Sequence, residues 1–238
     1  MSTARKNTRK GFSLVELMVV VLILTIIVGA LFGQINRAQM RYSVETRKLD
    51  LTQQERDFID LFARDLHTAG YPSPTIYGNR LDLGSKYTAA GIWWISQTDL
   101  RMEADVDGDG IVEEIAYHYD DGSVPGPNAC PCLMRASTHK VDGTMPWNQP
   151  DPVYYTQVEN IIPIATQPFF AAYSSTGAAI DISTAQKLAS ASLTDPTYQL
   201  LHTIRNVAIV FTTQAGLDQN TRQPIQVTMT GMARIPSN

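Results

Sequence analysis

The sequence predicts an α+β protein in which one long N-terminal helix packs on a domain of antiparallel β-sheet. Residues 12–33 form an almost uninterrupted apolar run, and a charged pattern of helical period continues from residue 34 to about residue 69. After Pro74 the pattern changes to short β-branched or aromatic runs that turn residues separate. A helical region is therefore followed by a strand-rich region.

The apolar run is long enough to cross a membrane. Residues 12–33 contain one charged side chain, Glu16. At about 1.5 Å of rise per residue, a helix of this length spans a bilayer core of roughly 30 Å. An ionised carboxylate in a bilayer costs on the order of 3 kcal/mol or more, so Glu16 requires a partner. We interpret the run as a membrane anchor that later becomes part of a protein assembly.

Four basic residues precede the apolar run: Arg5, Lys6, Arg9 and Lys10. Positive charges tend to stay on the cytoplasmic side, so we expect a cytoplasmic N-terminus and an exported remainder. An ordinary secretory signal has a shorter apolar core followed by a small-residue cleavage site, and no such site clearly follows this run. A simple single-pass anchor is the alternative interpretation.

The segment Lys10-Gly11-Phe12-Ser13-Leu14-Val15-Glu16-Leu17, followed by the apolar stretch, resembles the class III signal of type IV pilins and type II secretion pseudopilins. The resemblance implies that a prepilin peptidase cuts after Gly11 and methylates Phe12. It also implies that Glu16 meets the new amino group of Phe12 in a neighbouring subunit. Because a buried charge is tolerated when it is paired, this contact favours docking in one register.

The sequence from Arg64 to Pro72 and beyond resembles, more narrowly, the PilW-type minor pilins. This resemblance implies a minor pilin-like structural subunit for assembly or initiation of a type IV pilus-type filament, with other major and minor pilins or pseudopilins as partners. The alternatives are a pseudopilin of a type II secretion system and an adhesin or ligand-binding module displayed at a tip. The implied location is the inner membrane, single-pass, before assembly, and a periplasmic or extracellular filament afterwards.

The apolar run leads into an amphipathic helix. Phe58, Phe62, Leu66 and Ala69 recur at spacings of three and four residues, and Gly70 followed by Tyr71-Pro72 is a stop signal. We therefore predict one helix from about 13 to 69; two helices broken near residues 33–36 are the alternative. The expected parts are a leader (1–11), a transmembrane or assembly helix (12–33), an amphipathic extension (34–70) and a globular β-rich domain (71–238).

Runs of β-branched and aromatic residues predict the strands of the region after Pro74. The predicted strands include residues 92–95, 115–119, 153–155, 207–211 and 225–229. The last two alternate in polarity and enclose turn residues, which predicts a C-terminal hairpin. Residues 122–152 are rich in Pro, Gly, Asp and Asn and predict a long surface loop, while residues 181–195 could hold a short helix.

One acidic stretch has the chemistry of a metal site. Its candidate ligands are Asp105, Asp107, Asp109, the carbonyl of Ile111, and Glu113 or Glu114. Alternating carboxylates followed by Gly110 match the first half of an EF-hand-like calcium loop, but position 12 of such a loop would be Ala116. Calcium is therefore a candidate cofactor, and a simple Asp-Gly hairpin turn is the competing interpretation.

The remaining composition argues against other functional classes. The chain has 238 residues and a net charge of −4, so it lacks the basic surface typical of nucleic-acid binding. It contains no metalloprotease, serine-hydrolase, P-loop or dinucleotide motif, and we expect no enzymatic activity and no nucleic-acid partner. Its two cysteines, Cys130 and Cys132, leave open a strained disulfide, free thiols, a pair to another chain or half of a metal site.

Overall fold

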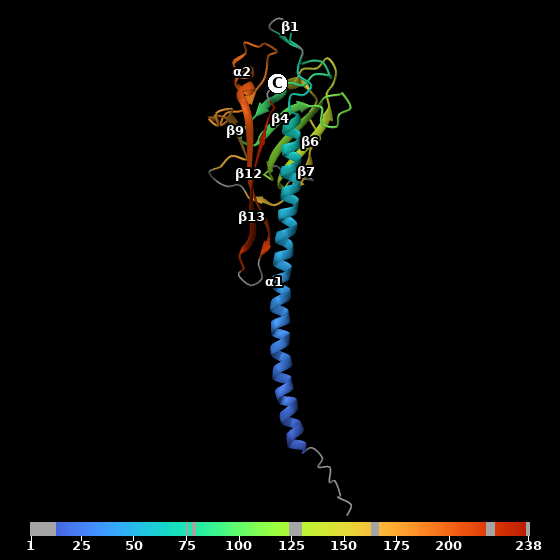
Figure 1. Cartoon of the computed structure of the whole chain (residues 1–238), viewed down its shortest axis with the longest axis vertical. Helices are drawn as coiled ribbons and strands as arrows, with labels where there is room; N and C mark the ends of the chain where they lie inside the picture. The colour runs from blue at the N-terminus through green and yellow to red at the C-terminus, as the bar shows by residue number, and fades with distance from the viewer. Residues whose placement is uncertain are drawn as a thin grey trace, which may run out of the picture.

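A computed structural model of the chain describes residues 13–74, 76–77, 80–123, 130–162, 167–217 and 222–236. Helix α1 (Leu14–Thr68) forms a stem. Its C-terminal half lies against a β-rich domain, and its N-terminal half projects from that domain alone (Figure 1). The predicted α+β fold is confirmed.

Helix α1 is continuous, as the first of the two helical interpretations predicted. No proline interrupts residues 12–71, and neither Gly29 nor Gly33 breaks the helix. At its start the Leu17 N–H donates to the Ser13 carbonyl over 3.1 Å. At its end Gly70 adopts a positive φ of 80°, a conformation that glycine tolerates without strain, and the chain leaves the helix there.

The described part of the domain forms two larger antiparallel sheets. The first has six strands in the order β11-β3-β4-β5-β6-β7. Their bounds are β3 (Gly91–Ile95), β4 (Asp99–Ala104), β5 (Glu113–Asp121), β6 (Pro131–His139), β7 (Tyr155–Val158) and β11 (Gln186–Lys187). The second has the order β10-β9-β12-β13, and β8 also pairs with β12. These strands are β8 (Ile161–Ile162), β9 (Phe170–Ser174), β10 (Ala179–Ile180), β12 (Ile204–Leu217) and β13 (Pro224–Arg234).

Smaller elements complete the domain. A two-stranded ribbon joins β1 (Ile76–Tyr77) to β2 (Arg80–Leu81), and single-turn η1 spans Pro146–Asn148. Helix α2 covers Pro196–Thr203 at the end of the domain far from the stem (Figure 1). The predicted C-terminal hairpin is confirmed, because β12 and β13 pair in antiparallel register from Asn206↔Arg234 onward.

Three sequence predictions need correction. The loop expected over 122–152 contains strand β6, whose Cys132, Leu133 and Ala136 are buried although the strand lacks a β-branched run. The strand expected at 153–155 begins only at Tyr155. No helix forms within 181–195; α2 starts later, because the Asp195 carboxylate accepts the N–H groups of Thr197 and Tyr198 and so caps the helix.

The apolar stripe of α1 joins the two sheets. Phe62 is fully buried; its ring meets Tyr117 of β5 edge-on at 5.2 Å and stacks on Phe170 of β9 at 6.1 Å. Phe58 likewise contacts Phe211 of β12 at 5.7 Å. Buried aromatic pairs of this kind add stabilisation beyond their burial, so the second half of α1 belongs to the core.

Buried polar contacts fix the same half of the helix. The Asp65 carboxylate accepts hydrogen bonds from Tyr117 Oη at 2.6 Å and from Arg135 Nε at 2.7 Å. Nearer the middle of α1, the buried Glu55 accepts a hydrogen bond from the Thr213 hydroxyl on β12. Burial raises the pKa of Glu55, an effect that this hydrogen bond opposes. The helix is thus bonded to both sheets.

A close approach of α1 to β13 gives a test of this packing. A Cβ at Gly231 would lie 2.8 Å from Cγ2 and 3.0 Å from Cδ1 of Ile59 on the helix. A β-branched side chain cannot move Cγ2 without changing rotamer. We expect Gly231→Ala to lower the free energy of unfolding by about 1–3 kcal/mol, measured by chemical denaturation of the full chain in detergent. The same change should cost much less in an Ile59→Ala background; equal costs would show that this contact is not the cause.

Candidate functional site

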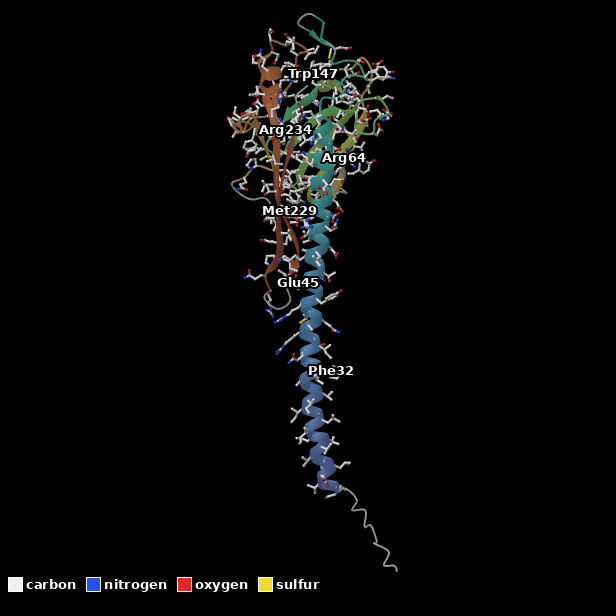
Figure 2. All side chains as sticks on the ribbon, viewed as in Figure 1. Phe32, Glu45, Arg64, Trp147, Met229 and Arg234 are labelled. Atoms are coloured by element: carbon white, nitrogen blue, oxygen red, sulfur yellow. A yellow bond between two sulfur atoms is a disulfide. The ribbon has the colours of Figure 1, made fainter. Side chains whose placement is uncertain are left out.

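The N-terminal half of α1 is bare. Every residue from 13 to 43 is exposed, and this stretch includes the apolar run. Figure 2 shows the side chains of this half, Phe32 among them, standing out from the helix with no other element beside them. Within the described residues, α1 is the one helix that has the length and composition to cross a membrane. A bare apolar surface of this size needs a cover, which lipid or other helices can provide.

Glu16 lies in the first turn of this bare half and is exposed. A carboxylate at a helix N-terminus interacts favourably with the helix dipole and the free N–H groups there. Gly11 and Phe12, the predicted processing site, lie outside the described residues. The predicted roles of Gly11, Phe12 and Glu16 therefore stay predictions.

The acidic loop joins β4 to β5 and is held by its own backbone. Asp105 accepts N–H groups of Gly108 and Gly110 at 2.8 and 3.1 Å. Asp107 accepts from the Asp109 N–H at 3.0 Å, and Asp109 from the Ile111 N–H at 2.7 Å. The three carboxylates have oxygen atoms within 4.8 Å of one another. Both the turn and the calcium loop remain compatible with this arrangement, and calcium binding stays a prediction.

The two glutamates that were candidates for the last ligand position point to opposite faces of β5, as neighbours on a strand do. Glu113 faces the acidic loop, where its Oε2 accepts the Val106 N–H at 2.9 Å. Glu114 instead lies 3.5 Å from Arg101 Nη1, and burial raises its pKa to about 7. The structure thus brings Glu113 toward the loop and separates Glu114 from it.

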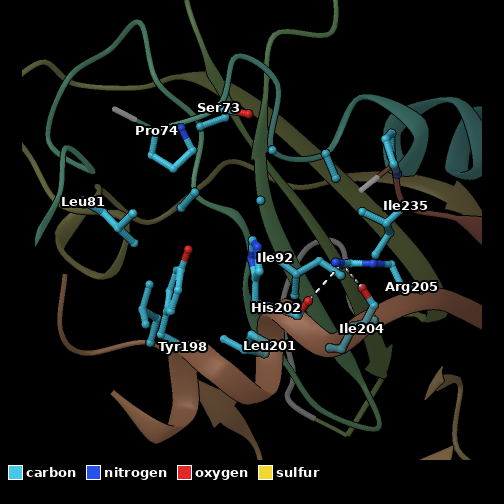
Figure 3. A pocket seen from close by; sticks show the side chains of 17 residues that line it. Ser73, Pro74, Leu81, Ile92, Tyr198, Leu201, His202, Ile204, Arg205 and Ile235 are labelled. Atoms are coloured by element: carbon cyan, nitrogen blue, oxygen red, sulfur yellow. Dashed lines mark hydrogen bonds between the residues drawn. The ribbon is translucent and has the colours of Figure 1, made fainter. Parts of the chain in front are cut away.

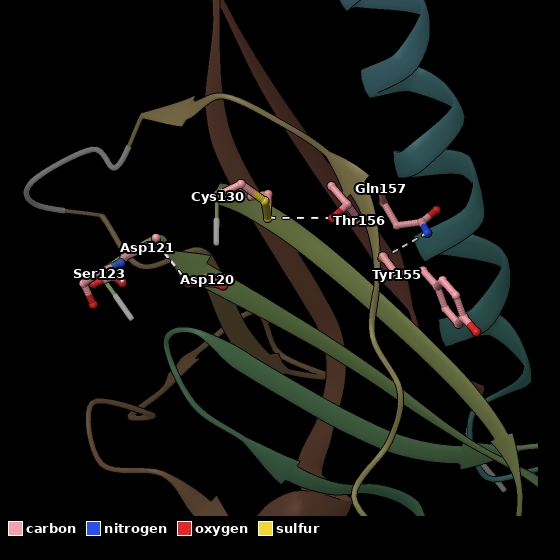
Figure 4. The surroundings of a disulfide bond; sticks show 9 residues. Asp120, Asp121, Ser123, Cys130, Tyr155, Thr156 and Gln157 are labelled. Atoms are coloured by element: carbon pink, nitrogen blue, oxygen red, sulfur yellow. Dashed lines mark hydrogen bonds between the residues drawn. A yellow bond between two sulfur atoms is a disulfide. The ribbon is translucent and has the colours of Figure 1, made fainter. Parts of the chain in front are cut away.

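The cysteines form a disulfide in the structure, between Cys130 and Cys132 (Figure 4). The bond lies at the start of β6, and the Cys132 sulfur is 4.0 Å from the Thr156 hydroxyl on β7. A disulfide persists in oxidising compartments, which agrees with export of the domain.

A cavity that the sequence did not predict lies between α2 and the C-terminal end of α1, at the end of the domain opposite the apolar half of the helix. Figure 3 shows Leu81, Tyr198 and Leu201 among the side chains that surround it. Its volume is about 140 Å³. Arg205 forms one wall, and its Nη1 donates to the carbonyls of His202 and Ile204 at 2.9 and 3.1 Å. Its lining residues come from segments far apart in the chain, so no local sequence pattern indicates it.

Comparison with known proteins identifies one feature. Residues 6–32 match the family model of the prokaryotic N-terminal methylation motif. No curated protein and no solved structure matches the chain. Together with the bare apolar helix, the motif supports a type IV pilin-like or pseudopilin protein that is anchored in a membrane. A signal of this type implies processing by a prepilin peptidase and assembly with other pilins, and proteins that carry it are generally structural.

Proposed function

We propose that this pilin-like chain is a minor pilin-like structural subunit that assembles or initiates a type IV pilus-type filament. One observation carries the proposal: a bare apolar half-helix with a single carboxylate in its first turn directly follows the leader region of a methylation motif. The looser resemblance of residues 64–72 to PilW-type proteins supports the minor subunit over the major one.

The proposed assembly mechanism depends on what surrounds the anchor, which is lipid before docking and neighbouring helices afterwards. The anchor first lies in the inner membrane with its N-terminus in the cytoplasm, where lipid covers the apolar side chains. When the subunit enters a helical bundle, protein replaces lipid around the anchor. Both surroundings are apolar, so the hydrophobic effect favours no particular register. A charge pair between Glu16 and the Phe12 amino group of a neighbour does favour one register. Gly29 and Gly33 would also let a neighbouring helix approach closely, since they have no side chain and nothing beyond the adjacent helix backbone lies within 4 Å of a Cβ placed there.

Two alternatives share this architecture. A type II secretion pseudopilin would use the same helix, and deletion of the chain would then abolish protein secretion while filaments persist. A ligand-binding module at a filament tip is favoured by the cavity beside α2, which lies at the end opposite the anchor. Specific binding of a surface or glycan by the chain, with filament numbers unchanged on deletion, would support the tip module.

The first prediction concerns the mature N-terminus. We expect mass spectrometry to find a chain that begins with N-methylated Phe12 in cells with a prepilin peptidase. In cells without the enzyme we expect the intact leader, since the cut after Gly11 requires it. An intact leader in both strains would reduce the chain to a plain anchored domain and remove the assembly mechanism.

A further inference from the structure

A second cluster of metal-ligating groups lies beside the acidic loop and draws on another strand. The register of β5 and β6 pairs Glu113 directly with His139, so the two side chains stand next to each other on one face of the sheet. Asp107 reaches them from the loop. One ligand atom of each residue lies within 4.8 Å of the others, and all three side chains line one cleft.

Glu113 is the residue of this cluster that is buried without a full set of hydrogen bonds. Only 3% of its surface is exposed, and one of its two carboxylate oxygens, Oε1, accepts no hydrogen bond. That oxygen lies 3.4 Å from Nε2 of His139, and the two atoms are not hydrogen-bonded to each other. A buried carboxylate with an unpartnered oxygen is costly unless a cation or a proton compensates it.

The neighbouring arginines do not fill this role. Arg135 lines the same cleft, but its Nε donates to Asp65 at 2.7 Å. Arg64 of α1 also lines the cleft but is exposed, and the ion pair of Glu113 is with His139. Burial raises the pKa of Glu113, and the negative charges of Asp107 and Asp105 add to the effect. The same carboxylates would favour a divalent cation, which neutralises several of them at once.

We propose that Asp107, Glu113 and His139 bind a divalent transition-metal ion of the Zn²⁺ type. An imidazole nitrogen with two carboxylates is a ligand set that suits such ions, whereas calcium selects oxygen ligands. The distance of 3.4 Å between the Glu113 and His139 ligand atoms fits one site. Tetrahedral zinc with bonds of about 2.0–2.1 Å places neighbouring ligands about 3.3 Å apart.

The proposed site is distinct from the calcium loop predicted from the sequence. It shares Asp107 and Glu113 with that loop but replaces Asp105, Asp109 and Ile111 by His139, and it adds strand β6, which the sequence did not predict. A bound ion would tie the acidic loop, the start of β5 and the end of β6 together. It goes beyond the filament proposal, since a metal-stiffened domain is compatible with any of the functions considered above.

The test is a metal titration of the tag-free full chain in detergent after treatment with a chelator. Zn²⁺ affinity is measured in competition with a chromophoric chelator, and Co²⁺ absorption reports whether the ion has tetrahedral geometry. We expect one tightly bound equivalent, tetrahedral Co²⁺ spectra and at least a tenfold loss of Zn²⁺ affinity in His139→Gln. Because 59% of the His139 side chain is exposed, this variant should fold normally.

Two controls separate the proposed site from other ligands. Asp109→Asn removes a carboxylate of the acidic loop outside the proposed set, and His118→Gln removes a histidine that pairs with Asp99 instead. Both should retain Zn²⁺ affinity. Absence of tight Zn²⁺ binding, unchanged Zn²⁺ affinity in His139→Gln, or an equal loss in His118→Gln would each overturn the proposal.

Discussion

Glu16→Ala is expected to leave the chain in the membrane but to reduce its incorporation into filaments by about tenfold or more. Removing one member of a buried charge pair costs about 3–5 kcal/mol, and each 1.4 kcal/mol corresponds to a factor of ten. Here the loss would leave the Phe12 amino group of a neighbour without its partner. Insertion should persist, because the substitution removes the single charged side chain of residues 12–33.

The measurement compares membrane and filament fractions of the variant with those of the unchanged chain. Glu45→Ala is the matched control, since it removes another exposed glutamate of α1 outside the apolar run. Glu45→Ala should assemble normally. Filaments that contain the Glu16→Ala chain at the normal level would contradict the pairing role of this carboxylate.

Lys140→Met is expected to destabilise the domain by about 3–5 kcal/mol. The side chains of Lys140 and Glu103 are both fully buried and lie 2.7 Å apart, and Lys140 also donates to the Thr88 carbonyl at 2.9 Å. Without the ammonium group, Glu103 keeps the Ala90 N–H as a donor but has no opposite charge. Tryptophan fluorescence during denaturation of the full chain in detergent measures the loss.

The pH dependence of the same variant identifies the cause. Burial already raises the pKa of Glu103, and loss of Lys140 removes the largest interactions that oppose this rise and leaves the hydrogen bond from the Ala90 N–H. A carboxyl whose pKa is higher in the folded state stabilises the fold at low pH and loses that contribution as pH rises. Lys140→Met should therefore be less destabilised at pH 5 than at pH 8. Adding Glu103→Leu should restore most of the stability; a double variant as unstable as the single one would refute this explanation.

The stem and the class of fold could be predicted because their signals are local. The apolar run, the stripe of Phe58, Phe62 and Leu66, and the stop at Gly70 each occupy neighbouring residues. The structure confirms that this stripe is buried against the sheets. Strands with β-branched alternation, such as the C-terminal pair, were found for the same reason.

The rest depends on contacts between distant residues, which a single sequence does not record. Arg135 bonds Asp65 across 70 positions, and strand β6, which carries Arg135, has too few β-branched residues to be recognised alone. The pairing of Glu113 with His139 follows from the register of that same strand. Because the sequence predicts a loop where β6 lies, it does not predict a site that includes His139.

The unbroken helix α1 makes the globular domain sensitive to how the first turn is held. Its 55 residues act as a lever arm. At about 1.5 Å per residue the arm is about 80 Å long, so a tilt of about 5° at one end moves the other end by about 7 Å. A slip of one residue raises the domain by about 1.5 Å and rotates it by about 100° around the helix axis. Anchoring at Glu16 would thus decide both the height of the domain and which of its faces meets a neighbour.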